Sequence, residues 1–130
     1  MLSLRKETDY AIQFIQFLVD NKDQCSALKT FAKQSGISFF FMQKIARKLN
    51  RAGIIEAEQG MCGGYRLKIK PDKLDLHQIV EIMEEGISLT KCIKNLSCGC
   101  NKGVKKCKVK DIMNKLNKEI VKAMKKIKLN

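Results

Sequence analysis

Four cysteines in the C-terminal part of the chain have the residue type and the clustering of a metal or cluster site. Cys92, Cys98, Cys100 and Cys107 lie within sixteen residues and are separated by five, one and six residues. Thiolates are soft ligands, and four that converge can hold zinc or an iron-sulfur cluster. Zinc ligands usually come in pairs separated by about two to four residues, and these cysteines form no such pair. A cluster tolerates irregular spacing better, so the spacing favours an iron-sulfur cluster over zinc.

The residues around these cysteines are consistent with a bound species. The segment 88–110 shows neither a helical nor a strand period, so hydrophobic packing gives it no reason to be ordered. Lysines flank the thiols, where their charge favours thiolates and offsets the negative charge of a thiolate-ligated cluster. The alternative is a set of reduced surface thiols with nothing bound. The flanking lysines are Lys91, Lys94, Lys102, Lys105, Lys106 and Lys108.

The composition of the chain indicates which kind of molecule it binds. The chain has 130 residues, enough for one domain with an appended element. Its 26 Lys and Arg residues against 13 Asp and Glu give a net charge of +13, which favours nucleic acid over an acidic small substrate. A solvated basic surface is the alternative. We expect no enzyme, because no nucleophile, base and acid occur at a recognisable spacing and no phosphate-binding glycine loop is present.

The hydropathy pattern indicates where in the cell the protein is expected. Charged residues interrupt the first turns of the chain, and no run of apolar residues is long enough to span a membrane. We therefore expect a cytoplasmic protein with no membrane partner. In a reducing cytoplasm the six cysteines are not expected to form a disulfide framework, which again favours a metal, a cluster or a redox switch.

A possible DNA-binding unit precedes the cysteines. Residues 28–35 have helical spacing up to Gly36, where a tight turn needs a residue that tolerates left-handed dihedrals. Ser38 is a good N-cap for a second helix, which should end before Gly53. This order of helix, turn and helix is typical of a helix-turn-helix. The apolar stripe of the second helix consists of Phe41, Met42, Ile45, Ala46 and Leu49.

The opposite face of the second helix is a candidate for the DNA major groove. Glutamine can bond to adenine, and arginine or lysine to guanine or phosphate, although exposed phenylalanines are less usual there. The candidate DNA-binding residues on this face are Ser38, Phe39, Phe40, Gln43, Lys44, Arg47 and Lys48.

A β-hairpin should follow this helix. Ile54 and Ile55 precede a glycine-rich segment, and residues 65–69 then alternate with a period of two. A helix-turn-helix followed by such a hairpin is a winged helix, whose wing contacts the DNA backbone or minor groove. Gln59 and Tyr65 are the candidate DNA-binding residues of this wing. An ordinary core helix pair with a surface hairpin is the alternative.

The flanking segments are expected to support this unit. Residues 3–19 predict a first helix, with Ser3 as a possible cap, and residues 76–83 predict a short helix that ends at Gly86. Residues 111–129 predict a long two-sided helix whose apolar stripe must dock on the body or pair with a second subunit. A membrane-surface helix is a weaker alternative. The expected division is a DNA-binding domain over 1–70 and, over 71–130, the short helix, the cysteine loop at 88–110 and a dimerisation helix at 111–129.

Taken together, these segments resemble the BadM/Rrf-two family of bacterial winged-helix regulators. The resemblance rests on LRKETDYAIQFI, GISFFFMQKIARKLNRAGII, GMCGGYRL and LDLHQIVEIMEEG, and it covers essentially the whole chain. It implies a mainly α fold with a small β-hairpin wing, a winged helix-turn-helix plus a long C-terminal dimerisation helix. It also implies a homodimer that binds double-stranded DNA and a [2Fe-2S] or [4Fe-4S] cluster held by cysteines of the loop before that helix.

The same resemblance suggests a ligand set for the cluster. Cys92 corresponds to the first cysteine position, Cys98 or Cys100 to the second, and Cys107 to the last. In some members the fourth ligand is an aspartate on the first helix of the partner subunit, which corresponds to Asp9. This loop has a fourth cysteine and no histidine, so an all-cysteine site is the alternative to ligation by Asp9.

The wing departs from the family pattern. The family often has an arginine before Gly-Pro-Gly-Gly-Gly-Tyr, whereas this chain has Gln59 followed by Gly60, Met61 and Cys62. Minor-groove recognition by that arginine is therefore absent, and Cys62 is a candidate for redox sensitivity.

The expected function is a DNA-binding transcriptional regulator that senses redox, nitric oxide or iron-sulfur status through the cluster. A cluster-free thiol switch or a zinc-stabilised repressor on the same fold is the main alternative. An iron-sulfur electron carrier with a basic docking surface is a further one.

Overall fold

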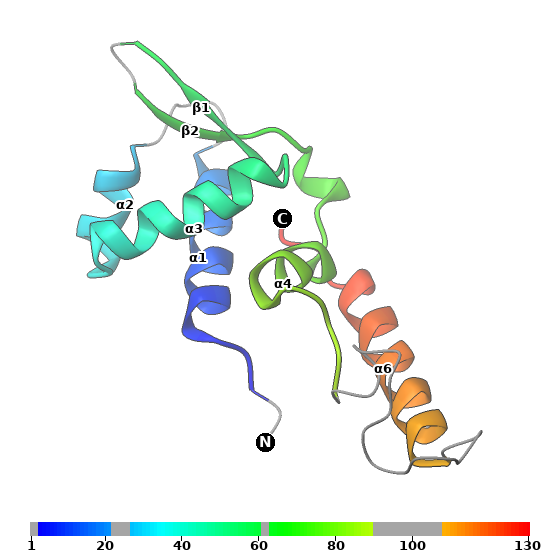
Figure 1. Ribbon diagram of the computed structural model, residues 1–130. Coiled ribbons are helices and arrows are strands. Elements are labelled where there is room, and N and C mark those ends of the chain that lie inside the picture. Colours follow the sequence, from blue (N-terminus) through cyan, green and yellow to red (C-terminus); the bar gives the residue numbers. More distant parts are fainter. Residues whose placement is uncertain (1–2, 22–26, 61–62, 90–107) are drawn as a thin grey trace.

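The computed structural model describes residues 3–21, 27–60, 63–89 and 108–130. Four helices, α1 to α4, form the body, with a β-hairpin at one end and α6 extending from the other (Figure 1). The elements are α1 (Lys6–Asp20), α2 (Leu28–Ser35), α3 (Phe39–Arg51), β1 (Ile55–Glu58), β2 (Gly64–Leu67), a 3-10 turn η1 (Pro71–Lys73), α4 (Leu76–Glu84) and α6 (Lys108–Lys126). The mainly α fold with a hairpin wing is thus confirmed.

The turn between α2 and α3 has the predicted geometry. Gly36 ends α2 in the left-handed region with φ of 73°, which a residue without a Cβ adopts at little cost. Ser38 occupies the N-cap position of α3, and its carbonyl accepts a hydrogen bond from the backbone N–H of Met42 at 3.0 Å. Its hydroxyl makes no capping bond, so Ser38 caps α3 only through its backbone.

The core is one cluster to which every helix of the body contributes. Phe14 and Ile15 of α1, Met42 and Leu49 of α3 and Met83 of α4 are fully buried in it. α4 packs against both α1 and α3. The helical periods of three segments therefore converge on a shared apolar interior. The division of the chain near residue 70 stays a prediction.

The start of α1 differs from the prediction. The helix begins at Lys6 and not near Ser3, and Arg5 is its N-cap. The reason lies in α4, because the Glu84 carboxylate accepts hydrogen bonds from the Arg5 backbone N–H at 2.8 Å and from the Thr8 hydroxyl at 2.6 Å. A carboxylate from another helix thus satisfies donors at the positive end of α1.

The wing is a two-stranded antiparallel hairpin, as predicted. Ile55 pairs with Leu67, and Ala57 pairs with Tyr65. Ile55, Leu67 and Tyr65 contact the core, whereas Ala57 is exposed. The alternate pair, Glu56 with Arg66, lies on the opposite side of the hairpin. Residues 61–62, including Cys62, lie outside the described residues.

The C-terminal helix begins and ends earlier than predicted. It was expected over 111–129, but α6 runs from Lys108 to Lys126. The chain then extends beside the start of α4, where the Leu76 N–H donates to the Ile127 carbonyl at 2.9 Å and the Leu129 N–H donates to the Leu74 carbonyl at 3.2 Å. Leu129 is only 6% exposed and belongs to the core. The backbone after Lys126 is extended so that the Leu129 side chain reaches the core, and α6 therefore ends at Lys126.

α6 is only partly covered by the rest of the chain. It packs against α4, and the side-chain amide of Asn117 donates to the Ile87 carbonyl at 3.2 Å. In its N-terminal half Val109 and Ile112 are each 61% exposed and Leu116 is 44% exposed. The described helices include none long and apolar enough to cross a membrane.

The extended C-terminus predicts a stability effect. Leu129→Ala should lower the free energy of unfolding by about 2 to 3 kcal/mol, because it removes a buried side chain and leaves a cavity. Ile127→Ala is the matched control, since Ile127 is 50% exposed and its truncation should cost less than about 1 kcal/mol. Urea unfolding of both variants at one protein concentration measures the difference. Equal losses in the two variants would contradict the role assigned to Leu129.

Candidate nucleic-acid interface

The second helix of the helix-turn-helix, α3, buries one face and exposes the other. Met42, Ile45, Ala46 and Leu49 are 0–1% exposed and pack into the core. The residues predicted for DNA contact lie outside this stripe. Phe40, Lys44 and Arg47 are exposed, and Gln43 is half-buried. The predicted orientation of α3 is therefore observed, whereas contact with DNA stays a prediction.

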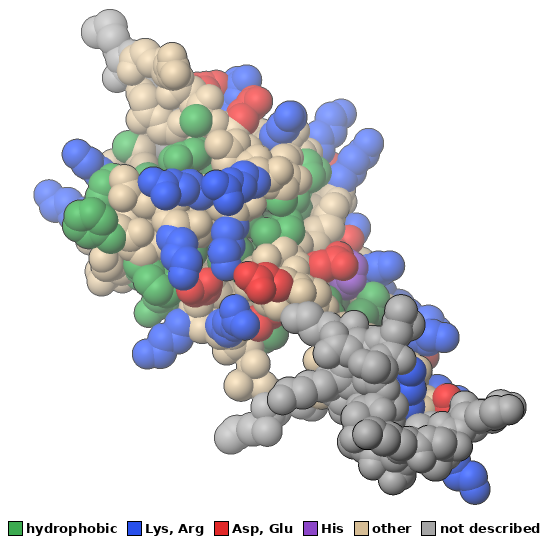
Figure 2. Space-filling view, viewed as in Figure 1, with side chains coloured by type: hydrophobic (Ala, Val, Ile, Leu, Met, Phe, Trp, Pro, Cys, Tyr) green, Lys and Arg blue, Asp and Glu red, His purple; other side chains and the backbone are tan. Residues whose placement is uncertain are grey.

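Basic side chains gather over α3. Figure 2 shows Lys and Arg side chains across the face of the molecule on which α3 runs, with acidic side chains beside them. Arg47 has no ion-pair or hydrogen-bond partner among the described residues. An unpaired guanidinium on an exposed helix face is suited to bind phosphate or guanine.

Two of the predicted DNA-binding lysines already have a partner within the chain. The two carboxylate oxygens of Glu7, on α1, form ion pairs with Lys44 Nζ at 3.3 Å and with Lys48 Nζ at 3.4 Å. The Glu7 side chain is 17% exposed, so water screens these pairs less than it screens a fully exposed pair. Glu7 was not among the predicted site residues, because nothing in its local sequence indicates a partner 37 residues away. The ion pairs fix the lysines to α1 and lower the charge that α3 presents.

The ionisation of Glu7 follows from these contacts. Burial alone raises the pKa of the Glu7 carboxyl, but the hydrogen bond from Lys44 and the charge of Lys48 outweigh burial. The net effect holds the pKa of Glu7 below its ordinary value, so the pairs persist at neutral pH.

The three phenylalanines that begin α3 have different surroundings. Phe39 is half-buried, and Lys29 Nζ lies 5.6 Å from the centre of its ring. Phe41 is also half-buried and meets Tyr10 edge-on, with ring centres 5.6 Å apart. Phe40 is 82% exposed. Of the two predicted DNA-binding phenylalanines, only Phe40 thus projects into solvent.

The arginine of the wing is paired with two glutamates of the opposite strand. Arg66 Nε lies 2.7 Å from a Glu56 oxygen, and Arg66 Nη1 lies 2.7 Å from a Glu58 oxygen. These cross-strand pairs were not predicted. Gln59 is exposed at the end of β1, whereas Tyr65 is half-buried with its ring edge-on to Phe14 at 6.3 Å. DNA contact by Gln59 and Tyr65 stays a prediction, and the position of Tyr65 also serves packing of the wing on α1.

The candidate cluster ligands are divided between described and undescribed parts of the chain. Cys92, Cys98, Cys100 and Cys107 lie outside the described residues. Asp9 is exposed on α1, and its carboxylate makes no hydrogen bond or ion pair within the described part of the chain. The described residues contain no group of three or more His, Cys, Asp or Glu that could hold a metal ion. Asp9 is therefore available as a ligand but is not part of a site formed by its described neighbours.

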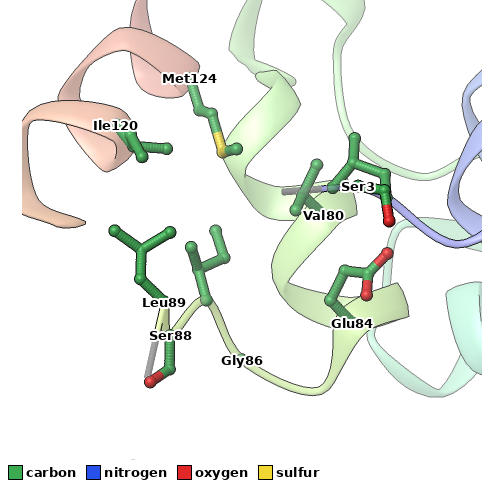
Figure 3. A pocket seen from close by; sticks show the side chains of 10 residues that line it. Ser3, Val80, Glu84, Gly86, Ser88, Leu89, Ile120 and Met124 are labelled. Atoms are coloured by element: carbon green, nitrogen blue, oxygen red, sulfur yellow. The ribbon is translucent and has the colours of Figure 1, made fainter. Parts of the chain in front are cut away.

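A cavity lies between α4, α6 and the segment before α1. Figure 3 shows Val80, Leu89, Ile120 and Met124 lining it, with Glu84 at its edge. Its volume is about 370 Å³. Because the Glu84 carboxylate is already hydrogen-bonded to the start of α1, the cavity offers mainly apolar walls. Ser88 and Leu89, the first two residues of the cysteine loop at 88–110, both line this cavity, and Leu89 is the last described residue before Cys92.

The Glu7 ion pairs predict a pH-dependent stability. Glu7→Gln should lower the melting temperature at pH 7 by roughly 2 to 5 °C. Because the folded pKa of Glu7 is lowered, its stabilisation is complete above the unfolded carboxyl pKa of about 4.3 and disappears as pH falls through the folded pKa. The two proteins should therefore melt alike at the acid end of a series from pH 7 to pH 3.

The control for this series is Glu119→Gln. The Glu119 and Lys122 side chains are 69% and 68% exposed, so removal of their pair should leave the melting temperature unchanged. A Glu7→Gln difference that stays constant down to pH 3 would contradict the assignment.

Known proteins with similar sequences and folds place the chain in a family. Residues 4–130 match the Rrf2 family, described as "Iron-dependent Transcriptional regulator". The HTH-type transcriptional regulator NsrR of Halalkalibacterium halodurans is 28% identical over 100 residues, which cover 76% of this chain and 68% of that protein.

Two solved structures share the fold. CymR, the global cysteine regulator of B. subtilis, has a TM-score of 0.79 at 18% identity and covers 99% of this chain and 94% of its own. IscR of T. potens has a TM-score of 0.77 at 21% identity, and the match covers 98% of this chain and 83% of that chain. Since the family match extends over residues 4–130 and the fold agrees with it, this protein belongs to the Rrf2 family of transcriptional regulators.

Proposed function

We propose that this regulator binds double-stranded DNA as a homodimer, with α3 of each subunit in a major groove. The observation that carries the proposal is the orientation of α3, whose buried stripe leaves Phe40, Lys44 and Arg47 on one exposed face. In helix-turn-helix proteins the second helix enters the major groove, and dimers bind half-sites about one helical turn apart.

The exposed part of α6 supports the homodimer. Val109, Ile112 and Leu116 follow helical spacing and remain exposed on a helix that otherwise packs on α4. An apolar stripe of this kind is stable in water only when another surface covers it. A second copy of α6 offers the same stripe, so a two-fold contact covers both at once.

We further propose that the cysteine loop holds an iron-sulfur cluster. The donor set of Cys92, Cys98, Cys100 and Cys107, with Asp9 as the alternative fourth ligand, has the chemistry that such a cluster requires. When bound, a cluster supplies sensitivity to oxidants, nitric oxide or iron supply. The description of the family as iron-dependent supports this cofactor. A cluster site requires reduced cysteines, so we also propose a cytoplasmic location, where thiols are kept reduced.

A route from Asp9 to α3 follows from the described contacts. Asp9 and Glu7 lie two residues apart near the start of α1, and Glu7 binds Lys44 and Lys48 of α3. A change at Asp9 that moves this part of α1 therefore changes the position of two lysines on the DNA-facing helix. We propose that a change in ligand occupancy at Asp9 shifts the protein between two arrangements of this part of α1.

A cluster-free thiol switch, or a zinc-stabilised repressor, is the second candidate. Its support is the similarity of fold to CymR of Staphylococcus aureus, which is known in an oxidized form and matches with a TM-score of 0.74 at 16% identity. Sequence-specific DNA binding would exclude the electron-carrier alternative as the main role.

The cofactor is tested by anaerobic purification. We expect a brown protein with equal amounts of iron and acid-labile sulfide per chain. Serine replacement of Cys92, Cys98, Cys100 or Cys107 should remove both wherever the replaced cysteine is a cluster ligand. Asp9→Asn distinguishes the mixed ligand set from the all-cysteine one, because only the mixed set should lose cluster stability. A colourless protein after anaerobic reconstitution would reject the cluster, and bound zinc would then favour the second candidate.

The DNA contact of α3 is tested by the salt dependence of binding. Arg47→Ala should weaken binding and reduce the slope of log affinity against log salt concentration by about one for each half-site. Lys115→Ala on α6 is the matched control, since it removes one exposed positive charge from a helix away from the proposed DNA face. An Arg47→Ala slope equal to that of the parent protein would reject phosphate contact by Arg47.

A further inference from the structure

The most exposed large hydrophobic side chain among the described residues is on α3. Phe40 is 82% exposed, whereas the next highest values are 61%, at Val109 and Ile112 of α6. The residues of α6 form a stripe that a second copy can cover. Phe40 lies in the first turn of α3, far along the chain from that stripe. Its exposure therefore needs a separate explanation.

Packing within the chain explains the neighbours of Phe40 but not Phe40 itself. Phe39 contacts Lys29 through its ring and packs against the core, and Phe41 packs edge-on against Tyr10. The nearest described ring to Phe40 is that of Phe39, at 6.4 Å between ring centres. An open hollow lined by Lys6 and Ile37 lies beside Phe40. No part of the described chain covers the outer face of the ring.

The surroundings of Phe40 define the chemistry of a partner. Arg47 follows two helical turns along the same face, and Lys6 lines the hollow. Lys44, one turn along, is paired with Glu7. An apolar ring bordered by cations suits a partner that is polyanionic but carries an apolar group among its polar atoms. The DNA major groove has this character, because phosphates flank it and each thymine places a 5-methyl group in it.

We propose that Phe40 recognises a thymine in each half-site by packing its ring against the 5-methyl group. The inference rests on the proposed function, and it assigns a specificity to one residue of that interface. The first residues of the second helix are those that contact base edges in helix-turn-helix complexes. Phe40 is the second residue of α3. A phenyl ring forms no hydrogen bond with a base edge, so it distinguishes thymine from cytosine by the methyl group alone.

The same geometry assigns different roles to the residues of this face. Arg47, which has no partner among the described residues, supplies charge that attracts DNA of any sequence, whereas Phe40 supplies a contact that only some base pairs can make. Removal of Phe40 should therefore change sequence preference more than it changes the salt dependence. Removal of Arg47 should have the opposite effect.

The experiment begins with selection of binding sites from a random-sequence duplex pool, using the full chain purified anaerobically. Each thymine of the selected duplex is then replaced by deoxyuridine, which removes only the methyl group. We expect one thymine per half-site at which this replacement weakens binding about fourfold, equal to about 0.8 kcal/mol for one buried methyl group. Phe40→Ala should bind the thymine and deoxyuridine duplexes equally, and Phe40→Leu should retain part of the difference.

Thermal unfolding confirms that the variants are folded, since Phe40 contributes little buried surface to the chain. Binding that is sequence-specific but independent of every thymine methyl group would overturn the inference and leave the proposed function intact. The same holds if Phe40→Ala keeps the full thymine preference. Failure of the parent protein to select any sequence would overturn the proposed function itself.

Discussion

The burial of one side of α3 is the constraint on which the rest of the interface depends. Met42, Ile45 and Leu49 are buried in the core that α3 shares with α1, α2 and α4, which fixes the rotation of α3 about its own axis. A helix whose apolar stripe is locked in this way can present only its opposite side to a partner. The positions of Phe40 and Arg47 are consequences of that packing. A polar residue in the stripe would therefore disturb DNA recognition without touching DNA.

The elements that were predictable from the sequence are those set by local patterns. Helical periods located α2, α3 and α4, Gly36 located the tight turn, and the alternation after the glycine-rich segment located β2. Local patterns do not identify distant partners. The attachment of Leu129 beside Leu74 and the contact of Glu84 with the start of α1 were missed for this reason. Ile127 continues the helical period of α6, so the sequence could not reveal that the helix ends before it.

Net charge alone gave an incomplete account of the interface. The value of +13 indicated a polyanionic partner, but Glu7 engages two lysines of α3, and Glu56 and Glu58 engage the arginine of the wing. The net charge of +13 already counts these glutamates, so the pairs leave its value unchanged and alter only where positive charge is exposed. These acidic residues also join α1 to α3 and β1 to β2, so the Glu7 pairs both neutralise and position Lys44 and Lys48, two candidate DNA-binding residues.

The most direct test of this account is methylation interference on a selected duplex, which locates the groove that each part of the protein occupies. Methylation of guanine N7 blocks the major groove, and methylation of adenine N3 blocks the minor groove. If α3 is the DNA-reading helix, guanine N7 interference should appear in two clusters about one helical turn apart, one for each subunit. Interference confined to adenine N3, or the absence of any cluster on DNA that the protein binds specifically, would contradict it.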